Sequence, residues 1–81
     1  MKVRVKLFAV AKQRVGSGAI DVELPDGATV RELRGALVEQ FPPLADVVPH
    51  VRFAVNSEYA SDAAPVPLAA EVAIIPPVSG G

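Results

Sequence analysis

One segment with helical periodicity, bounded at both ends, constrains the fold of this 81-residue chain more than any other feature. It opens with a capping box, in which the Thr29 hydroxyl accepts from the Glu32 amide and the Glu32 side chain reaches back. Apolar residues follow at helical spacing, and Pro42-Pro43 ends the segment because neither proline can donate an amide hydrogen bond. The sequence therefore predicts one main helix over residues 29–41. Its solvated face is expected to carry Arg31, Arg34 and Glu39.

The segments on either side of this helix have the pattern of strands. Charged and apolar residues alternate over residues 2–8 and again over 19–24, with Gly16-Ser17-Gly18 as the turn between them. After an irregular crossing, three more strands are expected at residues 51–55, near Tyr59 and at 71–75. The last of these is nearly all apolar, which favours a central place in the sheet. The predicted order is strand-strand-helix-strand-strand-strand.

This order predicts an α+β fold, with a mixed sheet packed on one main helix. If the first and last strands lie parallel at the centre, the arrangement is the ubiquitin-like β-grasp. The chain has room for a single core. We expect a domain over residues 1–75 and an extended C-terminal tail over 76–81.

Composition excludes several kinds of function. The chain has no cysteine, so disulfides and thiolate chemistry are ruled out, and the single histidine, His50, makes a metal site improbable. The net charge of −1 gives no drive toward nucleic acid. No stretch has the length of a membrane span or the apolar run of a signal peptide, so we expect a cytoplasmic protein. Gly16-Ser17-Gly18 lacks the lysine of a phosphate-binding loop, and we expect any ATP to be bound by a partner.

The C-terminal segment is the most informative part of the chain for function. It reads Pro76-Pro77-Val78-Ser79-Gly80-Gly81. Two prolines favour an extended backbone, and two glycines fit a channel too narrow for a Cβ atom. Such a tail is suited to carrying the Gly81 carboxylate into the active site of another protein.

A carboxylate reacts only after activation, and adenylation by ATP is the usual route. Attack of a persulfide sulfur on the acyl-adenylate gives a terminal thiocarboxylate, which is a sulfur donor. Attack of a cysteine thiol and then of a lysine amine gives a protein conjugate instead. The residues alone leave both outcomes open.

The whole chain resembles the small subunit of molybdopterin synthase, a family of sulfur carriers. The resemblance rests on Lys6-Leu7-Phe8-Ala9, Ala54-Val55-Asn56, Glu71-Val72-Ala73-Ile74-Ile75 and, above all, the Pro-Pro-Val-Ser-Gly-Gly end. The family has a β-grasp fold. One departure is Leu68-Ala69-Ala70, which stands where many members have an acidic, glycine-containing turn.

The resemblance implies a role for each residue of the tail. Gly81 would be adenylated by an E1-like adenylyltransferase and converted to a thiocarboxylate. Gly80 and Ser79 would lie with it in a pocket of the large subunit, where sulfur passes to cyclic pyranopterin monophosphate to build the molybdopterin dithiolene. The catalytic side chains belong to that subunit, and the family's assembly is a heterotetramer of two small and two large subunits. The other residues expected to contact partners are Val78, Pro77, Pro76, Ile75 and Phe8.

Phe8 is predicted from the residues to be part of this docking surface. Strand parity places it on the charged face, where it has no evident role in the core. With Ile75 or Ala73 beside it, Phe8 would form an apolar patch next to the tail. The alternative is a phenylalanine tucked under a loop.

Three other functions stay open at this point. The chain could carry sulfur for thiamine thiazole, for tRNA thiolation or for another metabolite. It could be a ubiquitin-like protein modifier. It could also be a non-catalytic interaction domain, for which removal of Gly81 would have no effect.

Overall fold

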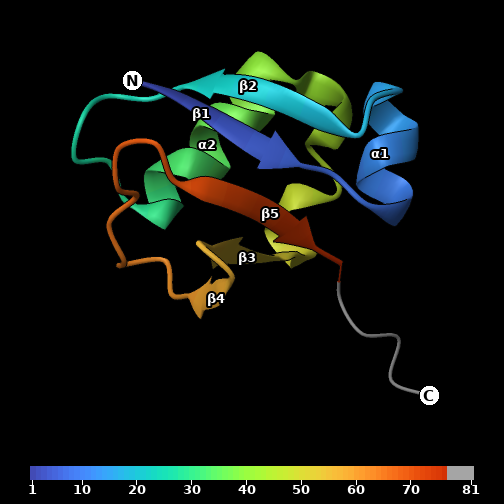
Figure 1. Ribbon diagram of the computed structural model, residues 1–81. Coiled ribbons are helices and arrows are strands. Elements are labelled where there is room, and N and C mark those ends of the chain that lie inside the picture. Colours follow the sequence, from blue (N-terminus) through green and yellow to red (C-terminus); the bar gives the residue numbers. More distant parts are fainter. Residues whose placement is uncertain (77–81) are drawn as a thin grey trace.

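The computed structural model describes residues 1–76, which form a five-stranded sheet and two α-helices (Figure 1). The elements are β1 (Lys2–Lys6), α1 (Ala9–Val15), β2 (Ala19–Glu23), α2 (Val30–Gln40), β3 (Arg52–Val55), β4 (Glu58–Ala60) and β5 (Glu71–Ile75). Two short 3-10 helices, η1 (Pro42–Leu44) and η2 (Val48–His50), connect α2 to β3. The predicted partner-binding and reactive residues Pro77, Val78, Ser79, Gly80 and Gly81 lie outside the described residues.

The strands follow the order β2-β1-β5-β3-β4 across the sheet. β5 lies at the centre, parallel to β1 and antiparallel to β3, while β1–β2 and β3–β4 are antiparallel hairpins. This is the β-grasp arrangement, and the prediction of parallel first and last strands is confirmed. Because β5 is central, the chain leaves the middle of the sheet at Ile75 rather than its edge.

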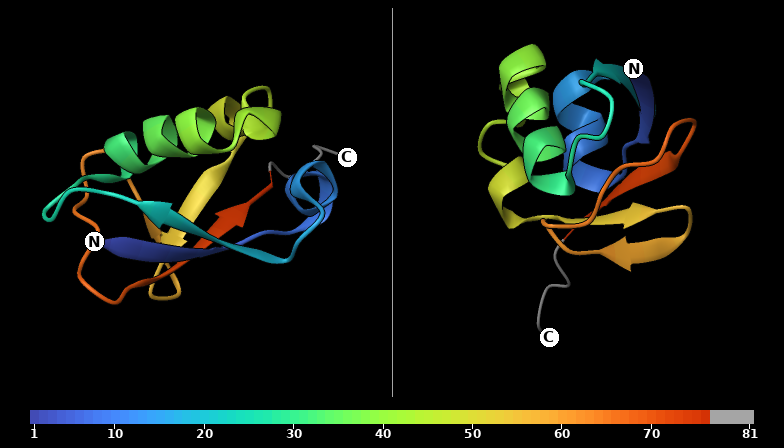
Figure 2. Two further views of the ribbon diagram at one scale, coloured as in Figure 1. Left: turned by 90° about the horizontal axis from the view of Figure 1, so that it is seen from above. Right: turned by 90° about the vertical axis from the view of Figure 1, so that its left-hand side faces the viewer.

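Helix α2 covers one face of the sheet, and Figure 2 shows no helix over the opposite face within residues 1–76. The capping box is confirmed: the Glu32 amide donates to the Thr29 hydroxyl at 3.4 Å, and the Thr29 amide donates to the Glu32 carboxylate at 3.1 Å. On α2, the buried residues that face the sheet are Val30, Leu33 and Leu37. Phe53 from β3 is also buried. The apolar stripe thus forms the core.

The predicted extent of the first strand was wrong, and a second, short helix was not predicted. β1 ends at Lys6, and residues 9–15 form the short helix α1. Ala11 is the one buried residue of α1, so the segment has no apolar stripe that periodicity could detect. Its end did carry a signal, since Gly16 caps α1 with a φ of 82° after the basic Lys12 and Arg14.

Arg34 was predicted on the solvated face of the helix, and this was wrong. Its guanidinium donates to the carbonyls of Val48 at 2.6 Å and Val51 at 2.9 Å, and to Asp62 at 2.8 Å. It also lies over the Phe53 ring, 4.9 Å from the centroid. Arg34 therefore ties α2 to the crossing before β3 and to the loop after β4.

The departure at Leu68-Ala69-Ala70 has a consequence for the backbone. The Ala70 amide donates to the Pro67 carbonyl at 3.3 Å and closes a turn whose third residue, Ala69, has a φ of 59°. A positive φ at this position is characteristic of type II turns and favours glycine. The turn before β5 is thus built with an alanine in a conformation that a Cβ atom disfavours.

Candidate functional site

The face of the sheet opposite α2 carries an apolar area beside the end of β5, which we call the tail-side patch. Its members are not buried, although their neighbours along each strand fill the core. Register places Lys6 opposite Ala73, Ala73 opposite Ala54, and Ala54 opposite Tyr59, so one row crosses four strands. The tail-side patch consists of Phe8, Ala54, Tyr59, Ala73 and Ile75.

Phe8 lies at the corner between β1 and α1. It is extended, with φ −132° and ψ 159°, and it is the N-cap residue of α1, while the following Ala9 has a φ of 50°. This left-handed residue turns the chain out of the sheet immediately after Phe8. The Phe8 side chain remains 47% exposed instead of being tucked under a loop.

Ile75 ends the central strand and directs the chain outward. It is partly buried, pairs with Arg52 of β3, and is followed by Pro76. β1 and β5 run parallel, so Phe8 and Ile75 both lie at the same end of the sheet. Figure 1 shows α1 and the end of β5 together at this end. The structure thus places Phe8, Ile75 and Pro76 where residues 77–81 begin.

Tyr59 belongs to the same face and was not predicted as a site residue. It is 68% exposed, and the Arg52 guanidinium lies over its ring at 5.4 Å from the centroid. The sequence did contain a signal for it: the two-residue turn Asn56-Ser57 fixes Ala54 opposite Tyr59. Residues directly opposite one another in a hairpin point to the same face of the sheet, so Tyr59 should point outward on the same face as Ala54.

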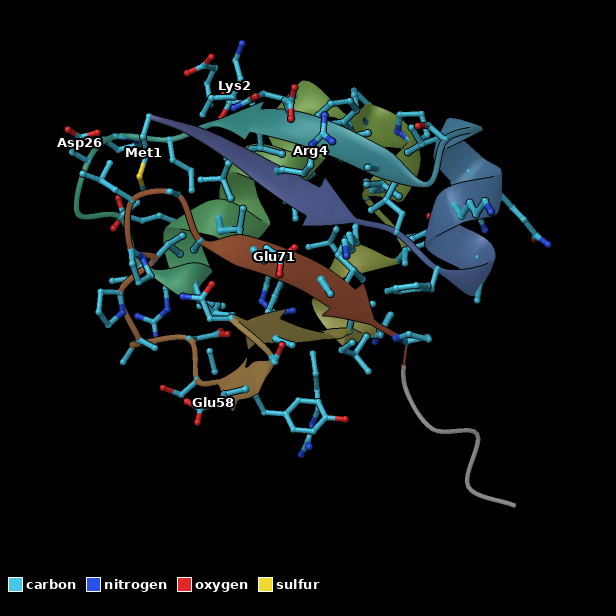
Figure 3. The ribbon with its side chains drawn as sticks, viewed as in Figure 1. Met1, Lys2, Arg4, Asp26, Glu58 and Glu71 are labelled. Carbon is cyan, nitrogen blue, oxygen red and sulfur yellow. The ribbon has the colours of Figure 1, made fainter. Side chains whose placement is uncertain are left out.

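A small hollow of about 90 Å³ opens in the uncovered face between β1, β5 and β3. The small side chains of Ala54 and Ala73 form its floor, and an ion pair of 3.8 Å between Lys6 and Glu71 flanks it. Figure 3 shows Glu71 near the middle of this face, with Arg4 on its β1–β2 side. This part of the face thus combines a shallow hollow with a pair of opposite charges.

Two kinds of site are not found among residues 1–76, a metal site and a membrane-spanning helix. No cluster of three or more His, Asp or Glu side chains in this part of the chain is arranged to hold a metal ion. His50 ends the 3-10 helix η2 and is exposed. None of the described helices has the length and apolarity needed to cross a membrane. Residues 1–76 thus form a β-grasp domain whose central strand ends beside an exposed apolar patch.

The chain belongs to the ThiS family, whose model matches residues 5–81. It is 40% identical over 81 residues to the molybdopterin synthase sulfur carrier subunit of Arabidopsis thaliana, covering all of this chain and 84% of the relative. A protein of the same name from Caenorhabditis briggsae is 36% identical over 83 residues, covering all of this chain and 99% of the relative. The resemblance drawn from the tail and strand motifs is thereby confirmed over the whole length.

Solved structures confirm the fold. SAMP1 of Haloferax volcanii, also described as small archaeal modifier protein 1, superimposes with a TM-score of 0.85 at 31% identity, covering both chains completely. A chain from the complex of subunits 1 and 2 of the molybdopterin-converting factor of Helicobacter pylori superimposes with a TM-score of 0.69, again covering both chains completely. At 20% identity this second likeness concerns the fold alone.

Proposed function

We propose that this chain is the sulfur carrier subunit of molybdopterin synthase, with the Gly81 carboxylate as its working group. The observation that carries the proposal is the family match through residue 81, on a chain whose central strand ends at Ile75. Curated relatives of that name align over the full length of this chain. The location proposed with this function is the cytoplasm.

The chemistry requires activation by a second protein. An E1-like adenylyltransferase binds ATP and forms an acyl-adenylate between Gly81 and AMP, releasing pyrophosphate. A persulfide sulfur then displaces AMP, and cleavage of the resulting S–S bond by a thiol leaves a thiocarboxylate. This chain contributes no cysteine to these steps, so both sulfur and thiol come from partners. Its own part is to supply the Gly81 carboxyl group.

The tail-side patch supports a docking role toward both partners. Gly80, Ser79, Val78 and Pro77 are proposed to enter the pocket of the large subunit, while Phe8, Ile75 and Pro76 contact its rim. Apolar side chains that are exposed beside a reactive tail give a partner a buried anchor close to the chemistry. The large subunit supplies the acid–base groups and binds cyclic pyranopterin monophosphate, within the proposed heterotetramer.

The test is an intact mass measured after incubation with the activating enzyme, ATP and a persulfide source. We expect the mass gain of one oxygen atom replaced by one sulfur atom. The gain should vanish when Gly81 is deleted and persist in Gly35→Ala, which leaves the tail intact. Absence of any gain, with enzymes shown to be active on another carrier, would contradict the sulfur-donor function.

The destination of the sulfur is tested separately. Thiocarboxylated protein mixed with the large subunit and cyclic pyranopterin monophosphate should yield molybdopterin. Thiocarboxylate formation without molybdopterin would instead assign the chain to thiamine thiazole synthesis, tRNA thiolation or another thiolation pathway.

A second function, protein modification, is favoured by the likeness to small archaeal modifier protein 1. Both functions use the same activated Gly81 and differ in the nucleophile. A modifier would form isopeptide bonds between Gly81 and lysines of other proteins. Mass spectrometry of digested cell protein for lysines carrying a tail-derived remnant distinguishes the two functions.

A further inference from the structure

The two outer strands of the sheet differ in what flanks their free backbone groups. β2 presents the backbone groups of Ala19, Asp21 and Glu23 outward, because the residues between them bond to β1. The Gln40 side chain accepts from the Glu23 amide at 3.0 Å and donates to the Glu23 carbonyl at 2.9 Å. The Ser17 hydroxyl donates to the Ala19 carbonyl at 2.8 Å and accepts from its amide at 3.4 Å. Side chains therefore close this edge at Ala19 and Glu23, and they leave one free amide and carbonyl between them, those of Asp21.

The edge of β4 is open at Tyr59. Asn56 and Ser57 have φ values of 51° and 69°, which indicates a type I′ hairpin whose flanking residues, Val55 and Glu58, form a hydrogen-bonded pair. The next pair, Ala54 and Tyr59, is then not hydrogen-bonded, so the Tyr59 amide and carbonyl point away from β3. No side chain or loop within residues 1–76 bonds to these two groups.

A groove of about 570 Å³ runs beside this open edge. Its lining comes from the β3–β4 hairpin and the loop that follows it, and it combines apolar side chains with the polar Asn56 and Ser61. The apolar residues that line it are Val55, Ala60, Ala64, Pro65 and Pro67, and Glu58 lines it at the end of the hairpin. A strand that hydrogen-bonds to Tyr59 would place alternate side chains toward this groove.

We propose that β4 accepts an extended segment of the protein that receives the tail, with an aliphatic side chain in the groove and a basic residue beside Glu58. Glu58 is exposed and forms no ion pair within residues 1–76. Figure 3 shows it pointing outward from the hairpin, on the opposite side of the molecule from Lys2. An unpaired carboxylate at the end of this groove selects a cation there.

The position of β4 favours the tail's own acceptor over an unrelated protein. β4 is two strands from β5, about 10 Å at the usual strand spacing. Tyr59 belongs to both surfaces, with its side chain in the tail-side patch and its backbone on the edge. One partner thus reaches both without spanning the molecule. The inference rests on the proposed function, because it places the large subunit of molybdopterin synthase at this edge.

A second copy of this chain fits the edge poorly. β4 has three residues, and only Tyr59 offers a free amide and carbonyl. Two such strands would bury much less than the roughly 1,000 Å² that a stable interface needs. A longer strand with its own side chains in the groove is the better occupant.

The test begins with amide hydrogen exchange of the labelled chain, alone and with the large subunit from the same organism. We expect the Tyr59 amide to gain at least about tenfold protection in the complex, comparable to one new backbone hydrogen bond. The Asp21 amide is the matched control, because it also points outward without a partner within residues 1–76 but lies on the β2 edge, and it should be unaffected. This measurement needs no substitution and is independent of whether a variant folds.

Two pairs of variants test the backbone and the charge. Tyr59→Pro removes the outward amide, and Tyr59→Ala removes the side chain alone; proline should weaken binding about tenfold beyond alanine. Glu58→Lys should weaken binding several-fold at low salt, and Glu23→Lys on the closed edge should have little effect.

Each result has one interpretation. Binding of the unaltered chain without protection at Tyr59 would overturn the edge inference and leave the proposed function standing. Failure of the unaltered chain to bind the large subunit would overturn both. Protection at Tyr59 that rises with protein concentration in the absence of a partner would show that a second copy occupies the edge, and the inference would be wrong.

Discussion

The two faces of the sheet carry phenylalanines in opposite environments. Phe53 on the covered face is 0% exposed, and Phe8 at the end of the uncovered face is 47% exposed. Phe53 packs under α2 and beneath Arg34, whereas Phe8 is held at a strand-to-helix corner by the left-handed Ala9. The covered face therefore accounts for stability, and the uncovered face is left free for partners. The following predictions test that separation.

The largest effect is expected for Phe53→Ala. Removing a fully buried phenylalanine from a core typically lowers the free energy of unfolding by about 3–5 kcal/mol. Urea denaturation followed by circular dichroism measures the loss. If the two faces are separate, thiocarboxylate formation per folded molecule should be unchanged. A loss below about 1 kcal/mol would contradict the assignment of Phe53 to the core.

Phe8→Ala should have the opposite profile. Because Phe8 is half exposed, its removal should lower the free energy of unfolding by less than about 1 kcal/mol. We expect binding to the large subunit to weaken by about tenfold or more, the effect of losing an interface anchor. Calorimetry measures the binding, and Val10→Ala is the control, an exposed apolar residue of α1 outside the tail-side patch. A large loss of stability with unchanged binding would make Phe8 structural.

The sequence predicted the covered face better than the uncovered one. Burial of whole apolar stripes repeats with the period of the element, and the capping residues Thr29 and Glu32 mark where α2 begins. The alternation over residues 2–8 likewise predicted a strand, and Val3 and Val5 of that strand are buried in the core. These patterns are local, so one chain is enough to reveal them.

What the sequence could not predict depends on contacts between distant segments. Arg34 is half-buried because the carbonyls of Val48 and Val51 meet it across the fold. Helical position alone cannot predict this, since Arg31, one turn earlier on the same helix, is exposed. Tyr59 joins the tail-side patch only through the register of three strands. The closed edge of β2 depends on Gln40, which lies seventeen residues from Glu23.

Ala69→Gly tests backbone strain next to the tail-bearing strand. Ala69 has a φ of 59°, where a Cβ atom costs roughly 1–2 kcal/mol, and the greater freedom of glycine in the unfolded chain offsets part of the gain. We expect a net stabilisation of about 1 kcal/mol or less, measured by urea denaturation, with binding to the large subunit unchanged. Ala63→Gly is the control, because Ala63 is exposed without a positive φ and should lose stability. Equal effects at both positions would rule out strain in the turn.

The smallest change in stability is expected for Gly35→Ala, at an exposed position of α2 that points away from the sheet. A Cβ atom there would meet nothing within 4 Å, and alanine is better than glycine inside a helix by about 0.5–1 kcal/mol. The melting temperature should therefore rise by a few degrees, while partner binding and thiocarboxylate formation stay the same. Gly16→Ala is a matched control because a Cβ atom would also have open space there, but its φ of 82° should make the change destabilising. A gain in stability that also altered partner binding would mean that the tail-side patch responds to the covered face, and the two faces would no longer be separable.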